Sequence, residues 1–175
     1  AYTVTFASNE GSGTVNSQAG LSGNTATLRE NTFTRDGYLP AGWNTASDGT
    51  GTAYWTESGN KTYDFSKNLT LYAQWSEVTV SNPPALDYGY TTGNILTVSA
   101  TAPLDHNTLS YRWYSNTENS TEGASAIENA TDSSYTIPTG LSAGTTYYYC
   151  VVTASGDGVS TVTGTSSIAA QVVNK

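Results

Sequence analysis

Residues 144–154 read GTTYYYCVVTA, and this stretch decides the fold class of the half of the chain that contains it. Three tyrosines precede Cys150 and two valines follow it. Aromatic and β-branched residues suit a pleated, half-buried surface, so the stretch predicts a β-strand. Because successive side chains of a strand point to opposite faces, Tyr148, Cys150 and Val152 share one face, and Tyr147, Tyr149 and Val151 share the other.

The composition extends this prediction to the whole chain. Its 175 residues are enough for one large or two small domains. Tyrosine contributes 13 residues and charged residues make up only 11%, a profile typical of β-rich proteins with many turns. No apolar pattern with a helical period persists for several turns, so any helix is short. We therefore predict an all-β protein.

The first half begins and ends in strand patterns. Tyr2, Val4 and Phe6 alternate with small or polar residues, and LTLYAQW at residues 69–75 alternates in the same way. Period-two alternation of this kind is typical of half-buried strands. The pattern predicts a first core built from Val4, Phe6, Trp43, Leu71 and Trp75.

A change of composition divides the chain. SEVTVSNPPA, at residues 76–85, contains a Pro-Pro pair, which stiffens a connection and cannot lie inside a central strand. We place the boundary near Ser76, which predicts domains at residues 1–76 and 77–175. Because the link is short, we expect an elongated arrangement with a small interface.

Several short strand patterns follow the boundary, separated by polar turns and with no helical segment between them. This spacing favours a β-sandwich over a βαβ fold. The patterns are NILTVSAT at 94–101, TLSYRWYS at 108–115, SSYTIP at 133–138, TTYYYCVVTA at 145–154 and SSIAAQVV at 166–173.

Five motifs of the first half occur in an order that resembles the Listeria–Bacteroides repeat, also called the internalin B-repeat. They are YTVTF at 2–6, ENTFTRDGY at 30–38, GWNT at 42–45, DGTGTAY at 48–54 and LTLYAQW at 69–75. The resemblance implies a small β-grasp-like fold with little helix, strung in tandem along bacterial surface proteins and without catalytic residues. Two positions depart from the family pattern. Pro40 stands where an aromatic residue is usual, and Glu10 stands where a glycine is usual. Since proline cannot donate to a strand ladder, we expect the strand carrying Trp43 to start after Pro40 or to run at an edge.

The second half resembles the immunoglobulin-like modules of bacterial surface proteins. Trp113 fits the core tryptophan of the C strand, and Tyr148-Tyr149-Cys150 fits the Tyr-x-Cys of the F strand. The position of the partner cysteine falls on Val98. The resemblance thus implies a sandwich without the disulfide, in which packing supplies the stability that the bond would have given.

Charge argues against a nucleic-acid partner. The formal net charge is −8, from 6 basic and 14 acidic residues, and the basic residues are not clustered as phosphate-tracking binders need. No apolar run approaches the roughly 20 residues of a membrane span. The chain contains no methionine and begins directly in a strand pattern, so we interpret it as a segment of a longer polypeptide.

The chain offers few candidates for catalysis or metal binding. Nucleophilic catalysis needs a base beside the nucleophile, and the single histidine, His106, lies beside Asp105 in a turn-rich connection where we expect it to be solvated. One cysteine and one histidine cannot supply a zinc site with its usual spacing. Asn44 and Asp48 lie in a glycine-rich loop that lacks the ligand series of a calcium site, so turn chemistry explains them better. We predict no enzymatic activity, no cofactor and no metal.

Aromatic residues are the remaining candidates for a binding site. Trp43, Trp75 and Trp113 lie in strand patterns beside apolar residues, and we interpret them as core anchors. Three other aromatic residues lie in polar surroundings and are candidates for exposed rings that contact a glycan or protein: Trp55, Tyr88 and Tyr90.

The lone thiol has two interpretations. No lysine, arginine or histidine adjoins Cys150 in the sequence to lower its pKa, and apolar surroundings would make the thiol inert. The resemblance to the immunoglobulin F strand implies that the face of Cys150 points inward, toward Trp113 and Val98. We therefore predict a core residue without a chemical role. The alternative is an exposed cysteine that links two chains.

Taken together, the patterns predict a non-catalytic stalk, spacer or adhesion segment of a larger, secreted surface protein of a Gram-positive-type bacterium, located outside the cell, at its surface or in its wall. We expect a monomer whose partners are neighbouring domains of the same chain, with a host or cell-wall glycan or protein as a further partner. The alternative is a carbohydrate- or host-protein-binding module that uses exposed aromatic residues or the groove between the domains.

Overall fold

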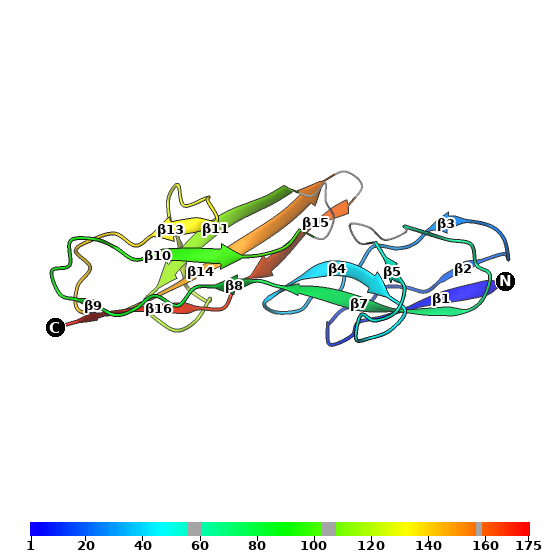
Figure 1. The fold of residues 1–175 in the computed structure, drawn as a ribbon, viewed down its shortest axis with the longest axis horizontal. Helices are drawn as coiled ribbons and strands as arrows, with labels where there is room; N and C mark the ends of the chain where they lie inside the picture. The colour runs from blue at the N-terminus through cyan, green and yellow to red at the C-terminus, as the bar shows by residue number, and fades with distance from the viewer. Residues whose placement is uncertain (56–60, 103–107, 157–158) are drawn as a thin grey trace.

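The fold is all-β, as predicted. A computed structural model describes residues 1–55, 61–102, 108–156 and 159–175, and none of these residues lies in a helix, so none belongs to a helix that could span a membrane. The strands form two groups that follow one another along the long axis of the molecule (Figure 1). The N-terminus lies at one end of this axis and the C-terminus at the other (Figure 1).

The first group centres on a five-stranded sheet. Its order is β2-β1-β7-β4-β5, and a two-stranded ribbon, β3-β6, accompanies it. The central pair, β1 and β7, is parallel, with Val4 opposite Leu69 and Ala7 opposite Tyr72. The strands are β1 (Tyr2–Ala7), β2 (Gln18–Gly20), β3 (Ala26–Thr27), β4 (Tyr38–Asn44), β5 (Ala53–Tyr54), β6 (Thr62–Tyr63) and β7 (Leu69–Glu77).

One core belongs to this group, and Trp43 lies at its centre. The Trp43 side chain is fully buried, with its ring centroid 4.8 Å from that of Phe6 and 5.9 Å from that of Phe33. Its indole Nε1 donates to the carbonyl oxygen of Arg29 at 2.8 Å, which satisfies the polar atom inside the core. The predicted burial of Val4, Phe6, Trp43 and Leu71 is confirmed, while Trp75 packs against this core and is half-buried.

Strand β4 contains a β-bulge, and the bulge reverses the faces of the sheet to which its side chains point. Pro40 pairs with Trp75 and Trp43 with Ala73, so three steps along β4 match two steps along β7. Gly42 lies in this irregularity with a φ of +92°, and a Cβ there would lie 2.3 Å from the Trp55 carbonyl oxygen. Only glycine fits, because a side chain would meet both an unfavourable backbone conformation and an immovable backbone atom.

The bulge directs two apolar side chains of β4 to opposite faces of the sheet. Trp43 lies opposite Ala73, and Leu39 lies opposite Ser76. Side chains directly opposite one another on paired strands share a face of the sheet. Ala73 and Ser76 are three residues apart on β7, so their side chains lie on opposite faces. Trp43 therefore faces the first core, and Leu39 faces away from it.

The expected effect of Pro40 was half right. Strand β4 begins at Tyr38, before Pro40, so the later start was wrong. The edge position holds in part, because β5 pairs only with Trp43 and Asn44 and does not reach Pro40. At Pro40 the strand has β7 as its one hydrogen-bonded neighbour among the described residues, so the missing N–H leaves no gap in a ladder.

The second group consists of two sheets. One has the order β13-β10-β8, and the other has the order β12-β11-β14-β16-β9 with β15 paired to β14 as well. All five strands expected from the sequence are present, and β15 is an additional long strand. The strands are β8 (Thr79–Val80), β9 (Leu86–Asp87), β10 (Ile95–Ser99), β11 (Thr108–Asn116), β12 (Ser125–Ala126), β13 (Ser134–Thr136), β14 (Gly144–Gly156), β15 (Val159–Thr165) and β16 (Ala169–Asn174).

Both sheets contribute to a second core, in which the lone thiol is buried. Cys150 lies directly opposite Trp113 in the antiparallel pairing of β11 and β14, and both side chains are fully buried. Tyr148 and Val152 share this core, and Val98 faces it from β10, as predicted. Cys150 is 0% exposed, so the prediction of a buried residue is confirmed. This burial raises the pKa of the Cys150 thiol to about 11.

The junction between the two groups differs from the expected proline-stiffened link. Strand β7 ends at Glu77, Val78 is buried in the second core, and β8 begins at Thr79. The Pro83-Pro84 pair lies farther on, inside the second group, where the Pro84 carbonyl oxygen accepts hydrogen bonds from the Asn94 and Gln171 side chains. The domain boundaries at residues 1–76 and 77–175 stay a prediction.

Replacing Gly42 with alanine tests the bulge. We expect Gly42→Ala to lower the free energy of unfolding by about 2 kcal/mol or more, because the new Cβ adds a clash to a strained backbone. Chemical denaturation followed by tryptophan fluorescence measures the change. Gly23→Ala is the matched control, since Gly23 has a φ of +81° and open space around it. Equal losses in the two variants would contradict the steric argument.

Two buried groups of the second core, the Cys150 thiol and the Tyr148 hydroxyl, predict a loss of stability in alkaline solution. Burial raises the pKa of Cys150 from 9.0 to about 11 and that of Tyr148 from 10.0 to about 12. The unfolded chain therefore loses these protons first, and the free energy of unfolding should fall as the pH rises from about 9 to about 12. Denaturation midpoints at pH 8 and at higher pH measure the fall. Cys150→Ala and Tyr148→Phe should each reduce it, and an unchanged fall in both variants would refute the assignment.

Candidate functional site: a groove between the two groups of strands

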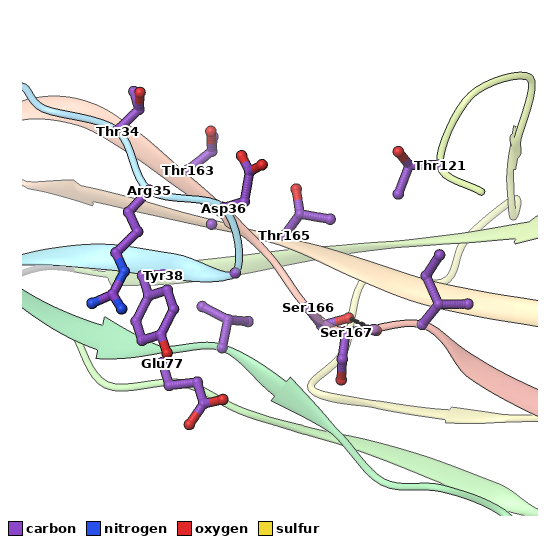
Figure 2. A pocket seen from close by; sticks show the side chains of 14 residues that line it. Thr34, Arg35, Asp36, Tyr38, Glu77, Thr121, Thr163, Thr165, Ser166 and Ser167 are labelled. Carbon is purple, nitrogen blue, oxygen red and sulfur yellow. Dashed lines mark hydrogen bonds between the residues drawn. The ribbon is translucent and has the colours of Figure 1, made fainter. Parts of the chain in front are cut away.

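A groove of about 630 Å³ lies where the first group of strands meets the second (Figure 2). Hydroxyl groups dominate its lining, together with one arginine, two carboxylates and one tyrosine. Its side chains come from Thr34, Arg35, Asp36, Tyr38, Glu77, Val78, Thr121, Thr163, Thr165, Ser166, Ser167 and Ile168.

The first wall of the groove is the turn that leads into β4. The Tyr38 N–H donates to the Arg35 carbonyl oxygen at 3.1 Å, and Gly37 supplies the positive φ, +80°, that the turn requires. The Arg35 guanidinium carbon lies 4.0 Å from the centre of the Tyr38 ring. This cation–π contact holds the arginine and the tyrosine as one unit along the groove.

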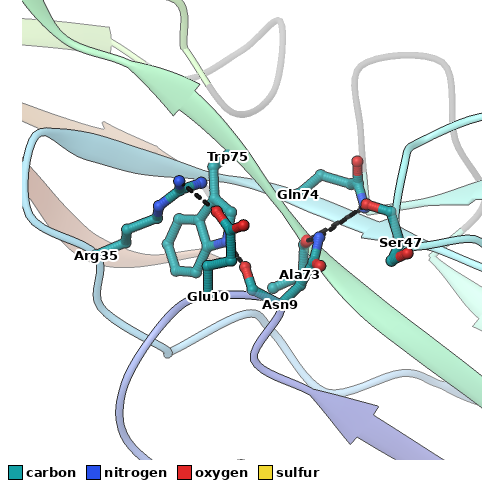
Figure 3. Close-up of polar contacts among 7 residues, drawn as sticks. All are labelled: Asn9, Glu10, Arg35, Ser47, Ala73, Gln74 and Trp75. Carbon is teal, nitrogen blue, oxygen red and sulfur yellow. Dashed lines mark hydrogen bonds and ion pairs between the residues drawn. The ribbon is translucent and has the colours of Figure 1, made fainter.

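Arg35 makes a second contact, with Glu10. Its Nη2 atom lies 2.5 Å from Oε2 of Glu10, in the turn after β1 (Figure 3). Glu10 has a φ of +72°, in the left-handed region that glycine adopts without strain. This conformation explains why a glycine is usual at this position in the repeat that the sequence resembles. The glutamate introduces strain and in return pairs with Arg35.

The same turn is tied to β7 through Asn9. Its side-chain Nδ2 donates to the carbonyl oxygens of Ser47 at 2.9 Å and Ala73 at 2.8 Å, and its own carbonyl oxygen accepts from Trp75 Nε1 at 2.7 Å (Figure 3). Asn9 has a φ of +47°, which asparagine tolerates better than most residues. These bonds anchor the turn that carries Glu10, and through Glu10 they position Arg35.

The second wall is the break between β15 and β16. The buried Ser166 Oγ accepts from the Cys150 N–H at 2.9 Å and donates to the Ser167 carbonyl oxygen at 2.8 Å. The Ser166 N–H donates to the Cys150 carbonyl oxygen at 2.9 Å. Thr121 is held by its carbonyl oxygen, which accepts from the Tyr149 hydroxyl at 3.3 Å. This wall is therefore fixed to the central strand β14.

The groove is equipped for hydrogen bonding. Threonine and serine hydroxyls line one wall and the Arg35–Tyr38 unit the other, so a polar ligand would find donors, acceptors and one aromatic side chain. The Ser166 hydroxyl donates to the Ser167 carbonyl oxygen, whereas an activated serine nucleophile donates to a side-chain base. Within residues 1–55, 61–102, 108–156 and 159–175, no three histidine, cysteine or acidic side chains gather as a metal site requires.

The three aromatic candidates from the sequence lie away from this groove, and one is not exposed. Trp55 is 7% exposed, belongs to the first core and donates through Nε1 to the Leu28 carbonyl oxygen, so its expected exposure was wrong. Tyr88 is 69% exposed, as expected. Tyr90 is half-buried, and its hydroxyl donates to the Pro138 carbonyl oxygen at 2.6 Å. Ligand binding by Tyr88 or Tyr90 stays a prediction.

The other polar candidates resolve into local turns where the structure describes them. The Asn44 side-chain oxygen accepts from the Ala46 N–H, and Asp48 accepts from both the N–H and the hydroxyl of Thr50. The hydrogen bond from the Thr50 hydroxyl lowers the pKa of Asp48. Asp105 and His106 lie outside the described residues. The groove residues themselves were not predicted as a site, because no sequence pattern joins residues 34–38 to residues 163–167.

The turn at Glu10, the bulge of β4 and the strand β7 all lie within the stretch whose motifs resemble a known repeat. Residues 2–74 match the Listeria-Bacteroides repeat domain. The predicted repeat is thereby confirmed, and this family is typical of bacterial surface proteins. No curated protein matches the sequence. The β-grasp-like arrangement of the repeat and the immunoglobulin-like nature of residues 77–175 stay predictions.

The left-handed conformation of Glu10 gives a test of the anchored turn. Glu10→Ala removes the ion pair and keeps the backbone strain, whereas Glu10→Gly removes both. We expect the glycine variant to be more stable than the alanine variant by about 1 kcal/mol. Thermal and urea unfolding of the two variants measure the difference. An alanine variant as stable as the glycine variant would mean that Glu10 is not strained.

Proposed function

We propose that the chain is a non-catalytic spacer or adhesion segment of a secreted bacterial cell-surface protein, of the Gram-positive type. The observation that carries the proposal is the match of residues 2–74 to a repeat typical of such proteins. The end-to-end arrangement of the two groups of strands supports it, because a spacer gains length when its units follow one another in line (Figure 1).

The physical properties of the chain suit this role. Small β units joined without a flexible connection form a semi-rigid rod, and a formal net charge of −8 favours solubility and discourages self-association. A monomer whose partners are the neighbouring domains of the same polypeptide follows from this proposal. Enzymatic activity and a cofactor have no place in it.

Surface accessibility tests the proposed location. Intact cells that produce the full-length protein should bind an antibody raised against residues 1–175, and brief protease treatment of those cells should remove the signal. Lysed cells and a cytoplasmic marker protein serve as controls. An antibody signal that appears only after lysis would refute the location.

A second candidate function is recognition of a glycan or a host protein in the groove. One observation favours it: the groove of about 630 Å³ falls within the volume range of about 300–1,000 Å³ that ligand sites occupy, and it combines hydroxyls with the Arg35–Tyr38 unit. The groove between the two halves was one of the contact surfaces expected from the sequence.

Glycan arrays with the whole chain test this second function. If the groove binds sugars, Tyr38→Ala should abolish the signal of any glycan that the unmodified chain retains. Tyr88→Ala is the matched control, because Tyr88 is exposed and does not line the groove. Binding that survives Tyr38→Ala but is lost in Tyr88→Ala would move the site to the far end of the second group. An array without any signal would favour the spacer alone.

A further inference from the structure

Leu39 belongs to the repeat by sequence and to the second core by contact. It lies on β4 within the stretch that matches the repeat, yet its fully buried side chain clusters with residues from the other half of the molecule. The same cluster contains Val78, Leu96 and Trp113. Every other buried member of this cluster lies at residue 78 or beyond.

A glycine on the facing strand makes room for Leu39. A Cβ on Gly164 of β15 would lie 3.1 Å from Leu39 Cγ, 2.9 Å from Val78 Cγ2 and 3.1 Å from the Tyr38 carbonyl carbon. Such distances are shorter than a side-chain carbon tolerates, so the two strands can approach this closely only because residue 164 has no side chain. Gly164 has no positive φ, and its role is therefore spatial.

The backbone at the junction is also fixed. The ladder between β4 and β7 continues to the pair Tyr38 and Glu77, at the last residue of β7. The next N–H, that of Val78, donates to the Gly37 carbonyl oxygen at 2.8 Å. Each residue at the junction is therefore held in place. Glu77 is paired in the ladder, Val78 is buried, and Thr79 begins β8.

From these contacts we infer that the repeat completes the core of the second half, so that the two halves form one rigid and thermodynamically coupled unit. Leu39 is the residue that couples the two halves, and Gly164 leaves the space that its side chain needs. The second half loses part of its core when the repeat is displaced or altered at Leu39. The direction of the rod is set at this joint, since bending would withdraw a leucine from an apolar site into water.

Cys150 provides a built-in reporter for the test. Its thiol is fully buried in the second core, so it reacts with a disulfide reagent only when that core opens. The unmodified chain should react slowly when native and completely when unfolded. We expect Leu39→Ala to accelerate the native reaction about tenfold or more, although residue 39 lies in the other half of the sequence.

Three variants make the result specific. Leu71→Ala is the matched control, because Leu71 is also fully buried but lies in the first core, and it should change the Cys150 reaction far less. Leu39→Val should give an intermediate acceleration if Leu39→Ala is too unstable to purify. Gly164→Ala should also accelerate the reaction, because the new Cβ would push Leu39 and Val78 away from β15.

Rigidity is measured independently by the distance distribution between two spin labels. Thr70→Cys and Ser134→Cys, both made together with Cys150→Ala so that the native thiol takes up no label, place the labels on exposed strand positions in the two halves. The distribution should be narrow in the otherwise unmodified chain and broader with Leu39→Ala. An unchanged Cys150 reaction in Leu39→Ala, an equal acceleration by Leu71→Ala, or a broad distribution in the unmodified chain would each overturn the inference.

Discussion

The pairing of β4 with β7 is the constraint on which the rest of the structure depends. It places Trp43 over Ala73 in the first core, and through the bulge at Gly42 it turns Leu39 to the opposite face of the sheet. A regular strand would have sent both side chains to the same face. One extra residue in β4 thus allows the ladder between β4 and β7 to place one side chain in each of the two cores.

Polar groups inside both halves follow a common principle. The four indole N–H groups donate to backbone carbonyl oxygens, those of Leu28 and Arg29 among them, so that each tryptophan adds apolar area to its core without leaving a donor unsatisfied. Cys150 has a related function for the backbone, because its N–H and carbonyl oxygen bind Ser166 where β15 gives way to β16. The groove wall and the second core are therefore parts of the same hydrogen-bonded structure.

The sequence predicts the parts that repeat with a short period and misses those that depend on contacts between distant segments. Alternation identified β1, β7 and β14, and the five strands expected in the second half were found. Strand β15 was missed because Gly164 interrupts its pattern and resembles a turn residue, although its role is to admit Leu39. Trp55 was misjudged because its neighbours are polar, while the partners that bury it, among them Leu28, lie far away in the sequence. A groove between the domains was expected, but the residues that line it were not, since its two walls are about 130 residues apart along the chain.

The parallel pairing of β1 and β7 determines how the repeat responds to a pulling force. Strand β1 starts at Tyr2, and β7 leads out of the repeat at Glu77, so tension along the chain pulls the two parallel strands in opposite directions. The bonds between Val4–Ala7 and Leu69–Tyr72 lie across the direction of pull and must break together in shear instead of one after another. Resistance of this kind is set by the height of the unfolding barrier and not by equilibrium stability. A protein built on this pairing withstands sudden stretching better than its thermal stability alone would indicate.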